Sequence, residues 1–169
     1  MRNILQSASR LTCFFRKTGD NNSMTLNDIS VQISETIPKI EKALKHLEYS
    51  FRKISKFPVR FDIEDLEILE SFESFTSRFS RLSDIFSAKL LRSLILKGDP
   101  SFKGSLSDFL NESEKLGYIS DSKRWWAIRA LRNKEAHEYT DEDLRKYFEA
   151  IKAESIFVVS ETKALLKKL

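Results

Sequence analysis

The chain has 169 residues, a length suited to one compact domain, with 41% hydrophobic and 32% charged residues. Only four glycines and three prolines are present, so turns are few and long helices are favoured over a many-stranded sheet. The single cysteine, Cys13, excludes an internal disulfide framework and a cysteine-based zinc site. No apolar run approaches the roughly 18 residues of a membrane span. We therefore expect a cytoplasmic protein.

The net charge of +4 is distributed unevenly. Residues 1–23 contain four basic side chains and one acidic side chain, which leaves the rest of the chain nearly neutral. We interpret residues 1–24 as a disordered or mis-annotated N-terminal extension, with Met24 as the true start. Because this segment is poor in acids and contains arginine and serine, a transit peptide is the alternative interpretation. Residues 25–169 are then one helical domain.

The first predicted helix follows from an apolar residue at every third or fourth position between Ile33 and Ile54. Pro38 lies one turn into this pattern, where its missing N–H costs little if the helix begins near Thr36. The helix is expected to end near Phe57 and Pro58, because the residue before a proline disfavours helical dihedral angles.

A second and longer helix is predicted after Asp62, which is a suitable capping residue. Its apolar pattern continues for more than thirty residues, until Gly98-Asp99-Pro100 ends it. At about 1.5 Å per residue, such a helix is about 50 Å long. A helix of this length requires neighbours along its whole apolar face, which predicts a bundle.

Capping residues predict three further helices: one that begins with Ser105 and Asp108 and ends at Gly117, one that begins at Ser120 or Asp121, and a last one that begins with Thr140 and Asp143. No strand pattern competes with these helices. The predicted fold class is therefore all-α, an antiparallel bundle of four or five helices.

The segment from residue 123 to residue 139 carries the candidate chemistry. It contains five basic residues before its first acid: Lys123, Arg124, Arg129, Arg132 and Lys134. One of only two histidines, His137, follows, and Tyr139 lies two residues beyond it. Arginine is a permanent cation that can donate two hydrogen bonds to a phosphate, whereas histidine exchanges protons near neutral pH. The spacing Arg-x4-His alone is a weak signal, so the interpretation depends on the longer string of residues.

The order of these residues resembles a known motif. The stretch resembles the R-N-x-x-x-H-x-Y motif of the HepT toxins in the HEPN superfamily. Arg132 and Asn133 match its first two positions, His137 matches the histidine, and Tyr139 matches the tyrosine. The resemblance implies a HEPN-like helical bundle and a metal-independent endoribonuclease without a cofactor. It implies that Arg132 and His137 are catalytic across a homodimer interface and that Asn133 supports them.

The resemblance also implies a toxin–antitoxin partner, a minimal nucleotidyltransferase of the MntA type that adenylylates Tyr139. Possible RNA contacts are Arg124, Arg129 and Lys134. Because the domain is nearly neutral without its N-terminal segment, we expect a structured RNA such as tRNA as the substrate, and not bulk message.

Three alternatives stay open. Arg132, Asn133 and His137 could simply cap the C-terminus of a helix, where cations interact favourably with the helix dipole. The chain could be a noncatalytic subunit that binds the substrate or partner of a minimal nucleotidyltransferase, or a plain helical interaction module. Trp125 and Trp126 are expected to be packing residues on different surfaces, since adjacent helical positions point about 100° apart. His46 is expected to be solvated.

Overall fold

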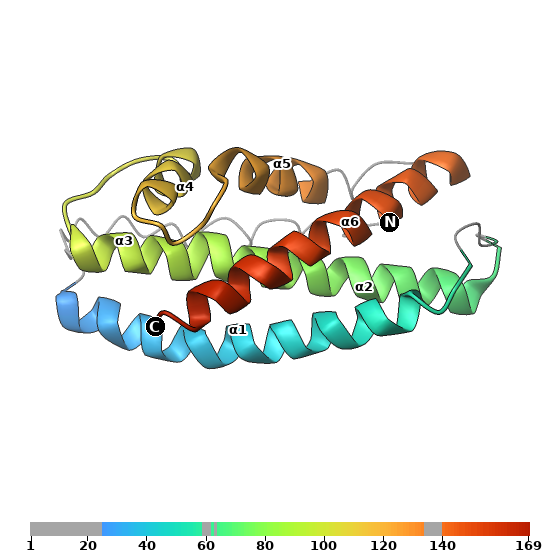
Figure 1. The fold of residues 1–169 in the computed structure, drawn as a ribbon, viewed down its shortest axis with the longest axis horizontal. Helices are drawn as coiled ribbons and strands as arrows, with labels where there is room; N and C mark the ends of the chain where they lie inside the picture. The colour runs from blue at the N-terminus through green and yellow to red at the C-terminus, as the bar shows by residue number, and fades with distance from the viewer. Residues whose placement is uncertain (1–24, 59–61, 63, 134–139) are drawn as a thin grey trace, which may run out of the picture.

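The computed structural model describes residues 25–58, 62, 64–133 and 140–169 (Figure 1). The expectation for residues 1–24 concerns a segment outside the described residues. The described residues form helices and their connections and include no strand, which confirms the predicted all-α bundle. None of the described helices is both long enough and apolar enough to cross a membrane.

The first helix, α1 (Leu26–Ile54), starts earlier than predicted. Thr25 and Asp28 form a capping box, in which the Asp28 amide donates to Thr25 Oγ1 (3.2 Å) and the Thr25 amide donates to Asp28 Oδ2 (3.0 Å). The predicted start near Thr36 is therefore wrong, and Pro38 lies inside the helix. Buried apolar residues before Pro38, among them Ile29, anchor the additional turns and offset the lost backbone hydrogen bond.

A continuous rod follows, made of α2 (Leu66–Asp84), the π-helix η1 (Ile85–Leu91) and α3 (Arg92–Gly98). Its N-cap is Asp65, whose Oδ1 accepts hydrogen bonds from the amides of Glu67 (3.0 Å) and Ile68 (3.2 Å). The predicted cap, Asp62, is wrong, because its carboxylate accepts instead from the Glu64 amide in the preceding turn (3.0 Å). The long predicted helix is confirmed apart from this start and the π-helical segment.

The three later helices begin where their capping residues predict. The helices are α4 (Leu106–Lys115), α5 (Ser122–Arg132) and α6 (Asp141–Leu166), and their N-caps are Ser105, Asp121 and Thr140. Gly117 follows α4 with a φ of +70°, a left-handed conformation that glycine adopts without strain.

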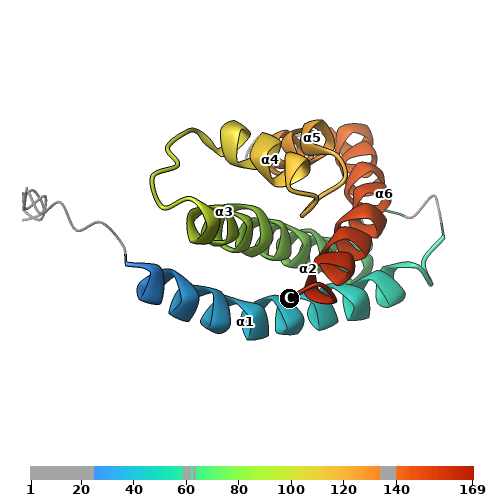
Figure 2. The ribbon, with the colours of Figure 1, turned by 60° about the vertical axis from the view of Figure 1, so that its left-hand side comes forward.

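The helices are arranged around the central rod (Figures 1 and 2). Helix α1 runs antiparallel to the rod along one side, and the short helices α4 and α5 lie on the opposite side. Helix α6 crosses obliquely and contacts α1, α2 and α5. The buried core is rich in aromatic side chains, which include Phe72, Phe75, Phe79, Phe86, Trp125 and Phe148. The fold thus fixes α5 between the rod and α6.

The cap of α4 gives a testable dependence of stability on pH. The Ser105 hydroxyl and the Ser105 amide both donate to Asp108 Oδ2 (2.7 Å each), and these hydrogen bonds hold the pKa of Asp108 below its ordinary value of 3.8. A lowered folded-state pKa stabilises the protein above pH 3.8, and this stabilisation is lost as the pH falls through the folded-state pKa. At pH 7 we expect the melting temperature of Asp108→Asn to be lower than that of wild type. Near pH 3 the difference in melting temperature should be smaller. Thermal unfolding followed by circular dichroism measures both differences. An equal difference at both pH values would contradict this expectation.

Candidate functional site

Arg132 lies in the last turn of α5, with its guanidinium held from two sides. Its Nη1 forms an ion pair with Asp84 Oδ1, and its Nη2 donates a hydrogen bond to Asn133 Oδ1 (3.2 Å). The side chain of Arg132 is 17% exposed, whereas that of Asp84 is 50% exposed. The charge of Arg132 is therefore fixed just below the surface, in reach of a ligand at the protein–water boundary.

One face of α5 produces this arrangement. Four residues share the helix face that packs on the rod, because they follow one another at intervals of three, one and three positions. They are Trp125, Ile128, Arg129 and Arg132. The indole of Trp125 stacks on the ring of Phe86, with 4.7 Å between ring centroids and an angle of 16°. The stack fixes the register of α5 against the rod. Arg132 lies two turns after Trp125 on α5, and there it pairs with Asp84 of the rod.

A small cavity lies between these two contacts. Its lining consists of Ser83, Asp84 and Ser87 from the rod and Trp125, Ile128, Arg129 and Arg132 from α5. The volume is about 10 Å³, which is about the room that one water molecule needs. A phosphate group is too large for it and would have to approach Arg132 from the outer surface.

The structure brings together some of the predicted site residues and separates others. Arg129 lines the cavity and has no carboxylate partner within the described ranges. Arg124 is turned toward α6, where its Nε pairs with Glu154 Oε2 (2.8 Å) and its guanidinium lies 4.1 Å from the ring centroid of Phe157. The charge of Arg124 is therefore already matched within the bundle.

Three predicted residues, Lys134, His137 and Tyr139, lie outside the described residues. Asn133 is the C-cap of α5, the position that the capping interpretation gave it, and its side-chain oxygen contacts Arg132 as well. A cap and a supporting role for Arg132 are therefore compatible at this residue.

The structure confirms that Trp125 is a core residue, that Trp125 and Trp126 face different surfaces, and that His46 is exposed. Trp125 is 2% exposed and Trp126 is 49% exposed, so the two indoles serve different surfaces. His46 is exposed on α1.

Sequence reasoning missed Asp84. An acidic residue in a long amphipathic helix normally belongs to its solvated face, and Asp84 carries no local signal that distinguishes it. Only the packing of α5 on the rod shows that its carboxylate meets Arg132. Over the part of the chain that the structure describes, no group of three or more His, Cys, Asp or Glu could hold a metal ion.

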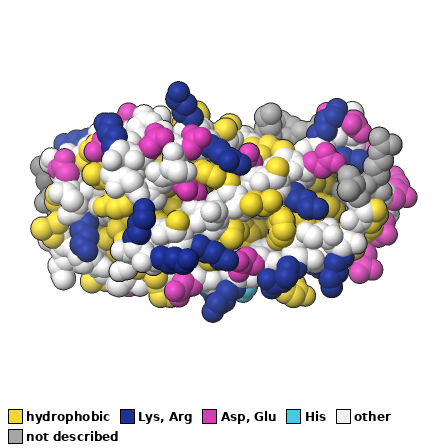
Figure 3. Space-filling view, in the orientation of Figure 1, with side chains coloured by type: hydrophobic (Ala, Val, Ile, Leu, Met, Phe, Trp, Pro, Cys, Tyr) yellow, Lys and Arg dark blue, Asp and Glu magenta, His cyan; other side chains and the backbone are white. Residues whose placement is uncertain are grey.

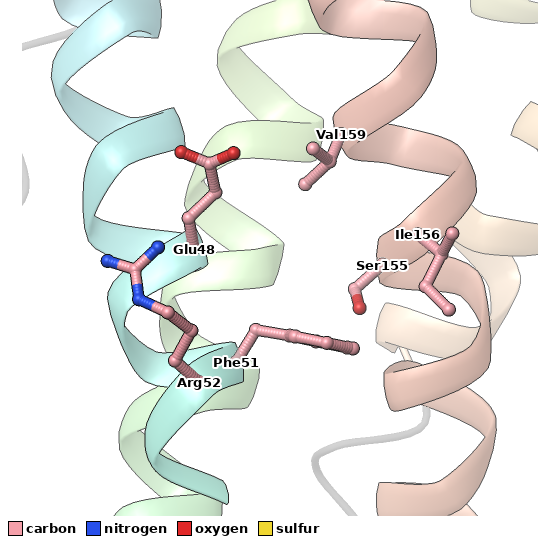
Figure 4. Close-up of a pocket in the computed structure, with 6 residues that line it drawn as sticks. All are labelled: Glu48, Phe51, Arg52, Ser155, Ile156 and Val159. Atoms are coloured by element: carbon pink, nitrogen blue, oxygen red, sulfur yellow. The ribbon is translucent and has the colours of Figure 1, made fainter. Parts of the chain in front are cut away.

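Two larger pockets lie elsewhere in the bundle. A groove of about 260 Å³ between α1 and α6 is lined by Glu48, Phe51, Arg52, Ser155, Ile156 and Val159 (Figure 4). Hydrophobic side chains come to the surface over α6 on this side of the molecule (Figure 3). A more polar pocket of about 250 Å³ lies between α1 and α2, where Arg78 donates to Ser50 Oγ. Neither pocket contains a residue of the predicted motif.

Comparison of the chain with protein-family models, with curated proteins and with solved structures found no match.

Proposed function

We propose that the chain is a HepT-like endoribonuclease of the HEPN type, the toxin of a toxin–antitoxin pair, which cleaves RNA without a metal ion. The observation that carries this proposal is the motif that starts at Arg132 and Asn133, at the C-terminal end of α5. A guanidinium held in place just below the surface, as Arg132 is by Asp84 and Asn133, supports it.

The chemistry needs few groups. The 2′-hydroxyl of RNA can serve as the nucleophile, so the protein has to move protons and stabilise charge on the phosphate. Arg132 supplies a fixed cation where negative charge develops, and His137 supplies a proton acceptor or donor near neutral pH. Each chain contributes one such pair, so a homodimer that brings two pairs to one phosphodiester provides both an acid and a base.

The proposed partner is a minimal nucleotidyltransferase antitoxin that adenylylates Tyr139 in the cytoplasm. Tyr139 lies two residues after His137 in the sequence. An adenylyl group there carries an anionic phosphate, which can pair with the Arg132 cation in place of the substrate phosphate. Modification of Tyr139 would then block cleavage.

The proposed substrate is a structured RNA such as tRNA. Arg129 supports an additional phosphate contact beside Arg132, because it lines the same cavity and its charge is unmatched by any carboxylate among the residues that the structure describes. Arg124 contributes less to such contacts, since Glu154 already neutralises it.

Incubation of the purified full-length chain with total cellular RNA in EDTA tests the proposal. We expect discrete cleavage by wild type and none by His137→Ala, because the motif histidine exchanges the protons. The matched control is His46→Ala, which removes the other histidine, exposed on α1, and should cleave as wild type does. If neither wild type nor His46→Ala cleaves RNA, the proposal fails and a noncatalytic subunit of a nucleotidyltransferase becomes the better interpretation.

A further inference from the structure

We propose that Asp84 is a positioning residue for RNA cleavage, which orients the Arg132 guanidinium toward the substrate phosphate. This inference rests on the function proposed above and adds a residue that lies outside the motif. Asp84 does not touch the substrate in this proposal; it acts through Arg132 alone.

The geometry around the guanidinium is the first argument. Asp84 engages Nη1 and Asn133 engages Nη2, so both terminal nitrogens of Arg132 are restrained. A guanidinium has five N–H donors, and these two contacts leave three for a phosphate. Arginine binds phosphate best through two parallel hydrogen bonds, which require its plane to be fixed beforehand. Asp84 provides this orientation before substrate binds.

The second argument is the direction from which a phosphate can arrive. The cavity that Arg132 lines has room for about one water molecule, so a substrate phosphate cannot enter it and has to approach Arg132 from the outer surface. The Asp84 carboxylate, which forms part of the lining of that cavity, is half exposed. Asp84 contacts only Nη1 of Arg132, so a phosphate can bind the remaining N–H groups without displacing Asp84. This favours a positioning role over competition between the carboxylate and the substrate.

The third argument is how rigidly the rod presents Asp84. Asp84 is the last residue of α2 and immediately precedes the π-helix η1, a kind of segment that occurs often at functional sites. Two residues later Phe86 is fully buried beneath Trp125. The backbone that carries Asp84 is thus held in place by the same stack that fixes α5, the helix that carries Arg132.

Steady-state cleavage by Asp84→Ala tests the role. We expect kcat to fall about 10-fold to 100-fold with KM changed less than about 3-fold, as for a misplaced catalytic group. Asp84→Glu keeps the carboxylate and should restore part of kcat. Glu73→Ala removes an exposed carboxylate from the same helix and is the matched control, with unchanged kinetics. Cleavage by Asp84→Ala at or above the wild-type rate would overturn the proposal, because Asp84 would then be neutral or a competitor of the substrate.

A second readout does not depend on cleavage. In nuclear magnetic resonance spectra of full-length protein with ¹⁵N-labelled arginine, the Arg132 guanidinium signal can be assigned through its loss in Arg132→Lys. We expect this signal to shift or broaden in Asp84→Ala and to stay unchanged in Glu73→Ala. An unchanged signal in Asp84→Ala would overturn the proposal. If wild type cuts no RNA, the ribonuclease function fails, while a changed signal still supports Asp84 as the residue that orients Arg132.

Discussion

Replacement of Arg132 by alanine is expected to lower kcat for RNA cleavage by about 100-fold to 1,000-fold, the loss typical when one donor to a developing negative charge is removed. The bundle should stay folded. Arg132 lies at the end of α5, and the carboxylate that loses its partner, Asp84, is half exposed and can be hydrated. Cleavage of a fixed RNA substrate, measured beside circular dichroism spectra, tests both parts of this expectation.

Two further variants separate the change in net charge from the loss of the planar pair of donors. Arg92→Ala makes the same change in net charge at α3, where the guanidinium lies 4.7 Å from the ring centroid of Phe109, and should cleave normally. Arg132→Lys keeps the cation but loses the planar pair of donors, so its rate should lie between those of wild type and Arg132→Ala. Wild-type cleavage by Arg132→Ala would show that the motif arginine has no part in the reaction.

The largest effect on stability is expected at Trp125, which is almost completely buried. Trp125→Ala should lower the free energy of unfolding by about 3–5 kcal/mol, since it removes a large core side chain and leaves a cavity. Its ring stacks on Phe86 and lies 6.0 Å, between centroids, from Phe157 of α6. The loss would therefore loosen α5 from both of its neighbours, and urea denaturation measures it directly.

The adjacent residue supplies the matched control for this experiment. Trp126→Ala removes the same side chain from the half-exposed surface of the same helix, and we expect it to change the free energy of unfolding by less than about 1 kcal/mol. Equal destabilisation by the two variants would contradict the packing described for α5.

Most helix boundaries could be predicted because they depend on local chemistry. The N-caps of α4, α5 and α6 are Ser105, Asp121 and Thr140, and Ser105 forms its cap together with Asp108. Each cap is formed by residues three or fewer positions apart. The start of α1 does not follow from the sequence pattern, because a proline favours the first turn of a helix whereas Pro38 lies inside α1. The capping box at Thr25 and the burial of Ile29 outweigh the cost of an internal proline, and neither contribution can be judged without the packing partners.

The π-helix η1 has a signal in the sequence. The apolar residues Leu82, Phe86, Leu90 and Leu94 follow one another in three successive steps of four. In an ideal α-helix each such step drifts about 40° around the axis, so three steps would move the pattern off the buried face. A wider turn offsets this drift, and all four side chains are buried. Repeated four-residue spacing is therefore the pattern that could have predicted η1.

The candidate site was only half predictable for a related reason. The motif from Arg132 onward is contiguous in sequence, so its residues could be named in advance. The carboxylate that pairs with Arg132 lies on another helix, and its position depends on how Trp125 and Phe86 set the register of α5. Contacts between distant segments of this kind follow from packing and have no local pattern.

The order of the elements also has a consequence during protein synthesis. The hairpin of α1 and the rod leaves the ribosome before α5, and α5 leaves it before α6, against which it packs. Because chains fold from the N-terminus as they emerge, the ion pair between Asp84 and Arg132 can form only after α5 has been translated. A nascent or truncated chain that ends before α5 would thus lack the assembled guanidinium site, and Phe86 of the rod would lack its partner Trp125.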